Sequence, residues 1–380
     1  MALYSDNYFN SRLFASYLIS IIILVGSPIA GMAVAGFPVS HFLEFPPLTR
    51  YVAHAPKNHV AFLLSIGFSI ILLTPLALRF LKYFRQVGIR PPAGKFPKWG
   101  LLGLGLMAVS WGVAWNIITT PQSVRMWTFT PLWLGFIIFL NALTQWRLGS
   151  CLMLRRPLAF MLLFFLSSLF WWYFEFMNRF VQNWYYIGVS NIGPAKYVFM
   201  ASLSFSTVLP AVLSLNELLK CTCAFEKAFD LKCHFVWQRW YAFVMLVFSI
   251  SCLIFLGRFP DILFPFLWIS PLLVICNTKK MLGVKENLID AVLDGRLGAI
   301  ARLAVSGLVC GFFWEMWNFW SYPKWIYSIP YVAHFKIFEM PLLGYLGYLP
   351  FGLECASVAA VLIPLSEILN NSVYSTIKCL

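Results

Sequence analysis

Residues 312–354 read FFWEMWNFWSYPKWIYSIPYVAHFKIFEMPLLGYLGYLPFGLE. This stretch places three carboxylates, Glu315, Glu339 and Glu354, in or beside apolar sequence that is rich in tryptophan. An ionisable side chain within a membrane is costly, so each of the three is a candidate for function. Five glycines and prolines between positions 341 and 352 disfavour a straight, strong helix. We therefore predict that this segment is broken or re-entrant.

The rest of the chain has the composition of a membrane protein. Of its 380 residues, 61% are hydrophobic and 11% are charged, whereas about a quarter of the residues of a soluble protein are charged. Apolar runs recur along the whole length, and several are long enough to cross a bilayer as helices. We predict an all-α, polytopic helical membrane protein.

Ten transmembrane spans follow from these runs: 13–36, 60–78, 99–120, 128–146, 157–178, 197–219, 240–257, 260–277, 299–319 and 337–365. The loops between them divide the 28 Lys and Arg residues 20 to 8 between the two sides. The positive-inside rule then places both termini in the cytoplasm, in a multi-pass protein of the cell (inner) membrane. The same loops account for the net charge of +14, so the expected partner is the lipid bilayer and not nucleic acid. The oligomeric state stays open.

The sequence predicts no cofactor and no metal. Walker, Rossmann, HExxH and His-rich di-iron motifs are absent. Two loops contain several residues that could bind a metal, but their spacing matches no standard metal site. The first loop contains Cys221, Cys223, Cys233 and His234, and the second contains His41, Glu44, His54 and His59.

A four-span unit occurs twice in the chain. Glu175 and Asn178 match Glu315 and Asn318 at an offset of 140 residues, and Trp184 matches Trp325 at 141. Four is an even number, so both copies face the same way, which predicts a parallel pseudo-twofold repeat. The predicted organisation is a two-span extension with a basic cytoplasmic loop (1–98), a first repeat (99–239), and a second repeat carrying the candidate site (240–380).

The two copies differ in the surroundings of the shared acid. Arg179 follows Glu175 by four residues, so an ordinary intrahelical ion pair explains that acid as well as function does. Phe319 replaces the arginine in the second copy. Glu315 therefore needs another partner, such as Lys324, Tyr327, a bound group or a proton.

The candidate residues fall into two groups. We expect acid–base chemistry from Glu315, Glu339 and Glu354, with Asn318 orienting a carboxylate and with Glu175 and Asn178 as the equivalents in the first copy. Aromatic walls would hold a lipophilic substrate or a developing carbocation, although an interfacial aromatic belt also explains Trp and Tyr at span ends. The candidate wall residues are Trp314, Trp317, Trp325, Tyr327, Tyr345 and Tyr348.

The order of these elements resembles a known family. An acid and an asparagine near a span end, then Trp325-Ile326-Tyr327, then Glu339-Met340-Pro341, is similar to the duplicated membrane domain of the lycopene-cyclase type. The resemblance covers spans four to six and eight to ten, and the P-x-E-E doublet of the family is absent. It implies cyclisation of carotenoid ends by proton-initiated chemistry without a metal. It also implies Glu339 in the acid site and Glu315 as a supporting acid.

Three functions follow as hypotheses. The first is a membrane-embedded enzyme, a lycopene-cyclase-like isomerase or cyclase, that does acid–base chemistry on an isoprenoid- or carotenoid-like lipophilic substrate. The second is a transporter or channel whose broken tenth span lines the path. The third is a membrane scaffold whose acids are merely paired with cations or backbone groups.

Overall fold

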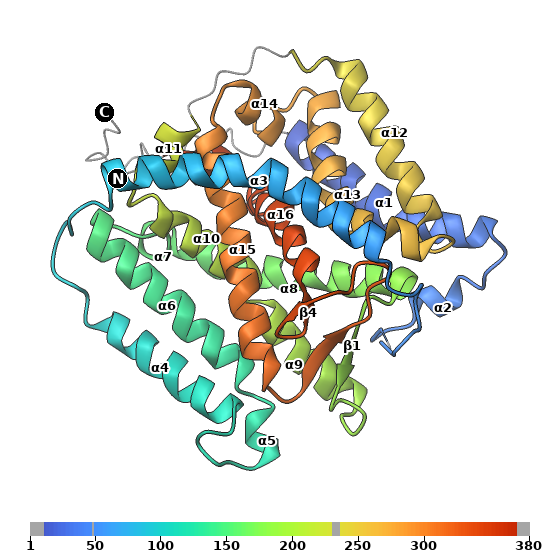
Figure 1. The fold of residues 1–380 in the computed structure, drawn as a ribbon, viewed down its shortest axis with the longest axis horizontal. Coiled ribbons are helices and arrows are strands. Elements are labelled where there is room, and N and C mark those ends of the chain that lie inside the picture. The colour runs from blue at the N-terminus through green and yellow to red at the C-terminus, as the bar shows by residue number, and fades with distance from the viewer. Residues whose placement is uncertain (1–10, 48, 230–235, 371–380) are drawn as a thin grey trace.

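The computed structural model describes residues 11–47, 49–229 and 236–370. Long helices dominate it (Figure 1). They are α1 (Ser11–Val34), α3 (His59–Val87), α4 (Trp99–Ala114), α6 (Phe129–Leu148), α8 (Pro157–Val181), α9 (Pro194–Phe205), α10 (Val208–Leu219), α12 (Arg239–Phe255), α13 (Pro260–Met281), α15 (Leu297–Phe319) and α16 (Tyr348–Ala359), with the 3-10 helix η1 (Leu342–Gly347) before α16.

Shorter elements lie between them. The short helices are α2 (Ser40–Leu43), α5 (Gln122–Arg125), α7 (Leu152–Arg155), α11 (Ala224–Ala228), α14 (Leu288–Leu293) and α17 (Leu365–Leu369). The strands are β1 (Trp184–Ile187), β2 (Lys324–Tyr327), β3 (Lys336–Ile337) and β4 (Met340–Pro341).

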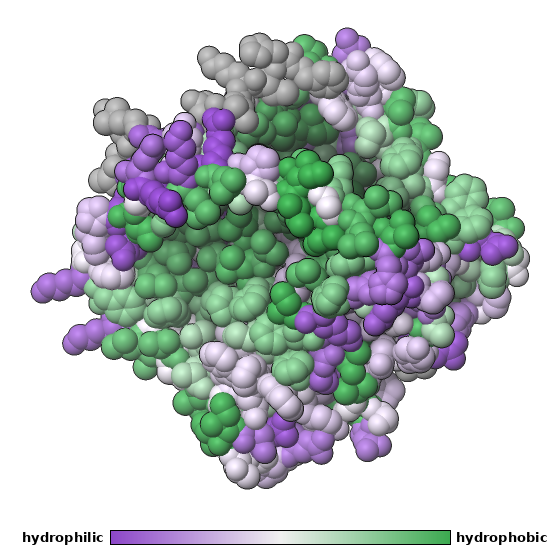
Figure 2. Space-filling view, in the orientation of Figure 1, coloured by the Kyte–Doolittle hydropathy of each residue, from purple (hydrophilic) through white to green (hydrophobic). Residues whose placement is uncertain are grey.

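The predicted membrane fold is confirmed. Within the described residues, eight helical segments are long and apolar enough to cross a membrane, and the shorter apolar helices α4 and α12 complete the predicted ten. The chain is an all-α, multi-pass membrane protein. Figure 2 shows apolar surface over the middle of one face, with polar residues gathered toward its edges.

The loops alternate between two ends of the bundle. At the strand end, which carries β1 and β2, His54 Nδ1 pairs with Asp261 Oδ1 at 2.6 Å, and Arg125 donates to the carbonyl of Trp320. At the charged end, which carries α7 and α17, Arg147 donates to the carbonyl of Arg90 at 2.9 Å. Each of these bonds joins loops that the ten-span prediction assigns to one side, so the helices pass back and forth as expected.

Helix α3 crosses the face of the molecule in front of α15 (Figure 1). Its apolar side chains are largely exposed, as expected of a helix in contact with lipid. It packs near its two ends, where the His59 ring contacts that of His334 and the Phe80 ring contacts that of Phe225. The sequence predicts an end at residue 78, but the helix continues to Val87 because Arg and Lys are good helix formers.

The predicted break in the tenth span is confirmed by the change from η1 to α16. The sixth span is also broken, at Ser206 and Thr207 between α9 and α10. Pro210 has no backbone N–H, so the carbonyl of Ser206 loses its helical partner. The Thr207 hydroxyl donates to the carbonyl of Ser204 at 2.8 Å and supports the local turn. Both breaks lie beside the candidate site.

Two glycines let α16 pack closely on α15. A Cβ on Gly352 would lie 2.0 Å from the carbonyl oxygen of Leu303, and one on Gly307 would lie 2.3 Å from that of Tyr348. No larger side chain fits either position without moving backbone. Gly352 therefore serves helix packing, and the close crossing fixes α16 next to Glu315.

Candidate functional site

Strands β1 and β2 pair in an antiparallel ribbon at the strand end (Figure 1). Trp184 lies opposite Tyr327, and Tyr186 lies opposite Trp325. Successive strand side chains point to opposite faces, so these four aromatic side chains share one face of the ribbon. All four line a cavity of about 130 Å³.

The cavity lies among the strand-end halves of the helices. Its walls are mainly aromatic, and its polar lining is sparse. Besides the ribbon, the aromatic side chains that line it include Phe129, Trp171, Tyr197, Phe205, Trp268, Trp314 and Tyr348. Phe351 lies beneath this group and contacts Trp171, Trp268 and Trp314 at centroid distances of 5.9–6.3 Å.

Glu175 lies directly behind one wall of the cavity. The residue is fully buried on α8. Its Oε1 accepts hydrogen bonds from the Tyr186 hydroxyl at 2.6 Å and from the indole N–H groups of Trp171 and Trp184, both at 3.1 Å. All three donors line the cavity, whereas Glu175 itself does not.

Glu315 occupies the matching position on α15 and is also fully buried. Its Oε1 accepts hydrogen bonds from the hydroxyls of Tyr327 at 2.7 Å and Tyr348 at 2.6 Å. The indole of Trp325 donates in turn to the Tyr327 hydroxyl at 2.9 Å. These three donors line the same cavity, so the two carboxylates reach it only through aromatic side chains.

Asn178 and Asn318 position the ribbon and do not contact a carboxylate. The Asn178 amide donates to the carbonyl of Trp184 at 2.7 Å, and its oxygen accepts from the backbone N–H groups of Asn183 and Trp184. Asn318 donates to the carbonyl of Trp325 at 2.8 Å and accepts from its N–H at 2.9 Å. Each asparagine therefore holds one strand on the helix that carries the acid.

Neither cavity acid has a cation beside it. Among the described residues, no Lys, Arg or His nitrogen lies within 4.0 Å of Glu175 or Glu315, and the Oε2 atom of each has no hydrogen-bond partner. The ion pair that the sequence offers to Glu175 is not formed, because Arg179 turns away and donates to the carbonyl of Phe42. A proton or a cationic ligand group is then needed to neutralise each carboxylate.

The two ribbon tyrosines are held in their neutral form. Burial, and then the neighbouring glutamate, raise the pKa of Tyr186 and of Tyr327 well above the ordinary value of 10.0. A neutral phenol donates and accepts a hydrogen bond at once. Each hydroxyl can therefore pass a proton between the carboxylate behind it and a group in the cavity.

The other two predicted acids lie elsewhere. Glu339 is in the turn between β3 and β4 and pairs with Lys324 at 2.5 Å and with Lys336 at 3.9 Å. Glu354 is fully buried on α16, and its recorded contact is a long hydrogen bond of 3.4 Å from the Leu272 N–H. No described hydrogen bond joins either acid to Glu315.

Four of the six predicted wall residues line the cavity, namely Trp314, Trp325, Tyr327 and Tyr348. Trp317 does not, because it packs beneath the wall against Trp133 at a centroid distance of 4.8 Å. Tyr345 also lies outside, and its hydroxyl donates to the carbonyl of Ile337 at 3.1 Å.

Sequence reasoning identified Glu175 and Asn178 in the first copy but missed the aromatic side chains beside them, Trp171, Trp184 and Tyr186. Trp184 and Tyr186 have the same Trp-x-Tyr spacing as Trp325 and Tyr327, and that spacing is the signal that identifies them. Trp171 lies one turn before Glu175 on the same helical face, which also predicts a contact.

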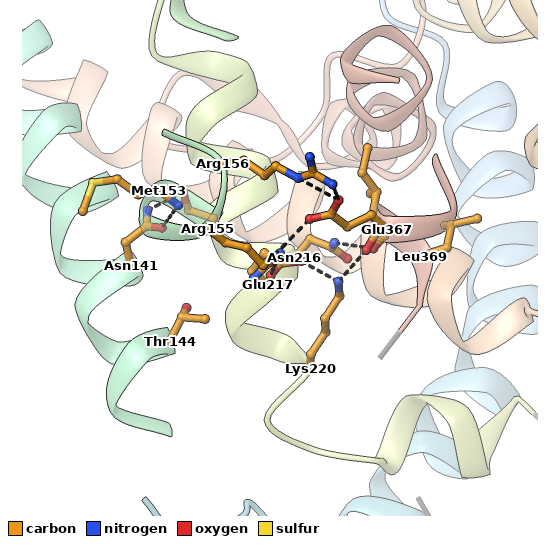
Figure 3. Close-up of polar contacts among 12 residues, drawn as sticks. Asn141, Thr144, Met153, Arg155, Arg156, Asn216, Glu217, Lys220, Glu367 and Leu369 are labelled. Carbon is orange, nitrogen blue, oxygen red and sulfur yellow. Dashed lines mark hydrogen bonds and ion pairs between the residues drawn. The ribbon is translucent and has the colours of Figure 1, made fainter. Parts of the chain in front are cut away.

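A cluster of charged side chains at the charged end was missed as well (Figure 3). Glu367 of α17 accepts from Arg155 at 3.0 Å and from Arg156 at 2.8 Å. Glu217 of α10 accepts from Arg155 at 3.0 Å and from Lys220 at 2.5 Å. Burial lowers the pKa of Lys220 to about 8, although Glu217 beside it opposes the shift.

The cluster ties α7 and α10 to α17, so it closes the charged end of the bundle. None of its residues lines the aromatic cavity. The cavity therefore belongs to the strand end, and packed side chains of α10, α16 and this cluster lie between it and the opposite end.

Glu367→Gln should reduce the free energy of unfolding by about 1.5–3 kcal/mol. The change removes the carboxylate that Arg155 and Arg156 share, while Arg155 keeps Glu217, and hydrogen bonds to charged groups contribute about that much. Thermal unfolding in mild detergent measures it, with Glu44→Gln at an exposed site as the control. A loss below about 1 kcal/mol would show that the pairs are as weak as surface ones.

The part of the chain that the structure describes shows no metal centre. Within the described residues, no group of three or more His, Cys, Asp and Glu side chains is arranged to hold a metal ion. Of the two predicted loops, Cys233 and His234 lie outside the described residues. In the other, His54 is engaged by Asp261 and by the carbonyl of Gln182.

No protein-family model, curated protein or solved structure matches the chain.

Proposed function

We propose that the chain is a membrane-embedded enzyme that does acid–base chemistry on a lipophilic substrate held in the aromatic cavity. One observation carries the proposal. Two buried carboxylates without cations, Glu175 and Glu315, each bond to tyrosine and tryptophan side chains that line one cavity. Such an arrangement has a cost to stability, which a catalytic or binding role explains.

The chemistry uses the tyrosines as the groups that touch the substrate. A proton on the Glu315 carboxyl passes to Tyr327 Oη while that hydroxyl gives its own proton to a carbon or oxygen of the substrate. Run in reverse, the same pair removes a proton, so a double bond can be protonated and a new one formed without net change in the enzyme. Glu175 and Tyr186 form the second such pair.

The substrate class follows from the walls. Trp and Tyr rings bind extended apolar chains, and their faces stabilise a cationic centre once water is excluded. A polyprenoid or carotenoid double bond that is protonated becomes such a centre. The resemblance to the lycopene-cyclase type supports the same substrate class, although here Glu315 and not Glu339 lies beside the cavity.

We also propose that the two halves are copies of one unit. Each glutamate accepts a hydrogen bond from the tyrosine of its own Trp-x-Tyr strand, and each asparagine bonds the backbone of the tryptophan in that strand. The ribbon register, in which Trp184 faces Tyr327 and Tyr186 faces Trp325, is the one that a pseudo-twofold axis through its centre produces. By the distribution of Lys and Arg, the charged end would face the cytoplasm of a cell membrane.

A turnover assay tests the enzyme proposal. Purified protein in lipid, incubated with a mixture of polyprenoids and acyclic carotenoids, should give an isomerised or cyclised product detected by mass spectrometry and chromatography. We expect Glu315→Gln and Tyr327→Phe each to reduce the rate about 10²–10⁴-fold, the usual contribution of a general acid or base. Loss of product in Glu339→Gln with full activity in Glu315→Gln would contradict our assignment and favour that of the lycopene-cyclase resemblance.

A transporter is the second candidate, and a separate observation favours it. The cavity is bordered by both helix breaks, through Phe205 and Val208 on one side and Tyr348 on the other. Discontinuous helices form the substrate sites of many secondary transporters. Uptake of an unchanged lipophilic cation into proteoliposomes, driven by a proton gradient and lost in Glu315→Gln, would identify this function.

A further inference from the structure

Glu354 is a buried carboxyl group that the cavity mechanism does not use. It is fully buried in α16, and no Lys, Arg or His nitrogen of the described residues lies within 4.0 Å of it. Its Oε1 accepts the 3.4 Å bond from Leu272, and its Oε2 has no partner. The first copy has Ser214 at the equivalent position, with an ordinary 2.8 Å bond from Asn141.

The cavity does not extend to Glu354. Phe351, one turn earlier on α16, packs against Phe174 and Trp268 and separates the acid from the cavity. Tyr348, which donates to Glu315, lies six residues before Glu354, or about 9 Å along the helix. The two acids therefore belong to different environments.

Polar groups continue from Glu354 toward the charged end. Ser357 lies one turn after Glu354 on the same face of α16, and its hydroxyl is 3.9 Å from the thiol of Cys276 on α13. The carbonyl of Ser357 accepts from the Tyr17 hydroxyl at 2.6 Å. The buried Lys279 donates to that hydroxyl at 2.7 Å and to the carbonyl of Glu286 at 3.3 Å.

We call Glu354, Ser357, Cys276, Tyr17 and Lys279 the polar column. The contacts above join the last four residues, and Glu354 lies one helical turn before Ser357. Leu272, Cys276 and Lys279 follow one face of α13 over about 10 Å of helix. The column therefore leads from the middle of the apolar bundle to the end where the basic loops lie.

The other titratable side chains around Glu354 supply no positive charge. They are Tyr173 of α8, whose buried hydroxyl has no described partner, and Cys355 of α16, which adjoins Cys310 of α15. Glu217 and Lys220 of the neighbouring α10 are engaged in the cluster at the charged end. A proton is the remaining means of neutralising Glu354.

We propose that Glu354 is a proton-binding site that exchanges its proton with the charged end along the polar column, separately from the aromatic cavity. The ligand is a proton. The hydroxyls of Ser357 and Tyr17 each take up one proton and release their own, so a proton leaves the carboxyl oxygen as another arrives and nothing else is consumed, while the backbone carbonyl of Ser357 only positions the Tyr17 hydroxyl. This inference stands apart from the enzyme proposal, because it concerns residues that do not line the cavity.

Infrared spectroscopy of the whole protein in lipid tests the proposal. A protonated carboxyl gives its own carbonyl band, and we expect a band at neutral pH that Glu354→Gln removes and that Glu315→Gln leaves in place. In D₂O this band should shift as the proton exchanges. Ser357→Ala and Tyr17→Phe should slow that shift at least tenfold, whereas Ser249→Ala, a buried serine on α12, should not.

A second measurement needs no variant. Dicyclohexylcarbodiimide reacts with protonated carboxyl groups in apolar surroundings, and peptide mass spectrometry should find Glu354 modified in the wild-type protein. A Glu354→Gln spectrum that lacks none of the wild-type carbonyl bands, or a Glu354 that stays unmodified, would overturn the proton site. If exchange is equally fast in Ser357→Ala, Tyr17→Phe and the control, the proton does not move along the polar column. Neither result depends on turnover in the cavity.

Discussion

A lipophilic amine should bind the cavity at least tenfold more tightly than the alcohol with the same carbon skeleton. N,N-dimethylgeranylgeranylamine is protonated at neutral pH and imitates a carbocation, whereas geranylgeraniol is neutral. The cavity, of about 130 Å³, has room for the amine or hydroxyl end of these molecules and not for the whole chain. The amine meets tryptophan faces, and cation–π attraction reaches about 2 kcal/mol or more when the bound cation loses its water. It also lies near two carboxylates that have no Lys, Arg or His nitrogen of the described residues within 4.0 Å. A tenfold difference corresponds to about 1.4 kcal/mol, which is less than the cation–π attraction of a desolvated cation alone.

Quenching of tryptophan fluorescence measures both affinities, because Trp171, Trp184, Trp268, Trp314 and Trp325 line the cavity. We expect Glu175→Gln and Glu315→Gln each to reduce the preference for the amine while leaving the affinity for the alcohol within about threefold. Glu44→Gln, an exposed acid at the same end, is the matched control. Equal wild-type affinities for the two compounds would show that the carboxylates do not act on the contents of the cavity.

Ala201→Phe should abolish binding of both compounds, with at least a hundredfold loss of affinity. Ala201 lines the cavity from α9. A cavity of about 150 Å³ accommodates benzene, so a phenyl ring is expected to occupy most of the 130 Å³ found here. The measurement is the same fluorescence titration, with thermal unfolding in detergent to show that the fold is retained.

Ala77→Phe is the control for that substitution, since Ala77 is exposed on the lipid-facing α3. It makes the same chemical change outside the cavity and should leave both affinities unchanged. If Ala201→Phe binds the amine as the wild type does, the ligand does not enter the cavity between the two acids.

The membrane architecture could be predicted from the sequence because it depends on local properties. Runs of apolar residues mark the spans, and the glycines and prolines after Pro341 indicate the break before α16. The break between α9 and α10 was missed because Pro210 alone is a weak signal. Its effect depends on the hydroxyls of Ser206 and Thr207, which bond to nearby carbonyls.

The site was only half predictable for a different reason. Glu315, Tyr327 and Trp325 are close in sequence, so one stretch identifies them. The contribution of Glu175 depends on the pairing of β1 with β2, which are about 140 residues apart. Glu339 was predicted as a site residue because it is an acid in apolar sequence. In the structure it forms an ordinary ion pair with Lys324 across the turn. The charged cluster combines residues from α7, α10 and α17, and no local pattern joins them.

The most direct test of the central claim is to map where the ligand lies. A diazirine derivative of geranylgeranylamine, activated by light in the purified protein, labels the residues that it touches. We predict labelled peptides from residues 184–205 and 314–327, suppressed by excess unlabelled amine and absent in Ala201→Phe. Labelling confined to lipid-facing helices such as α3, or labelling that the unlabelled amine does not suppress, would contradict the assignment of the cavity between Glu175 and Glu315 as the functional site.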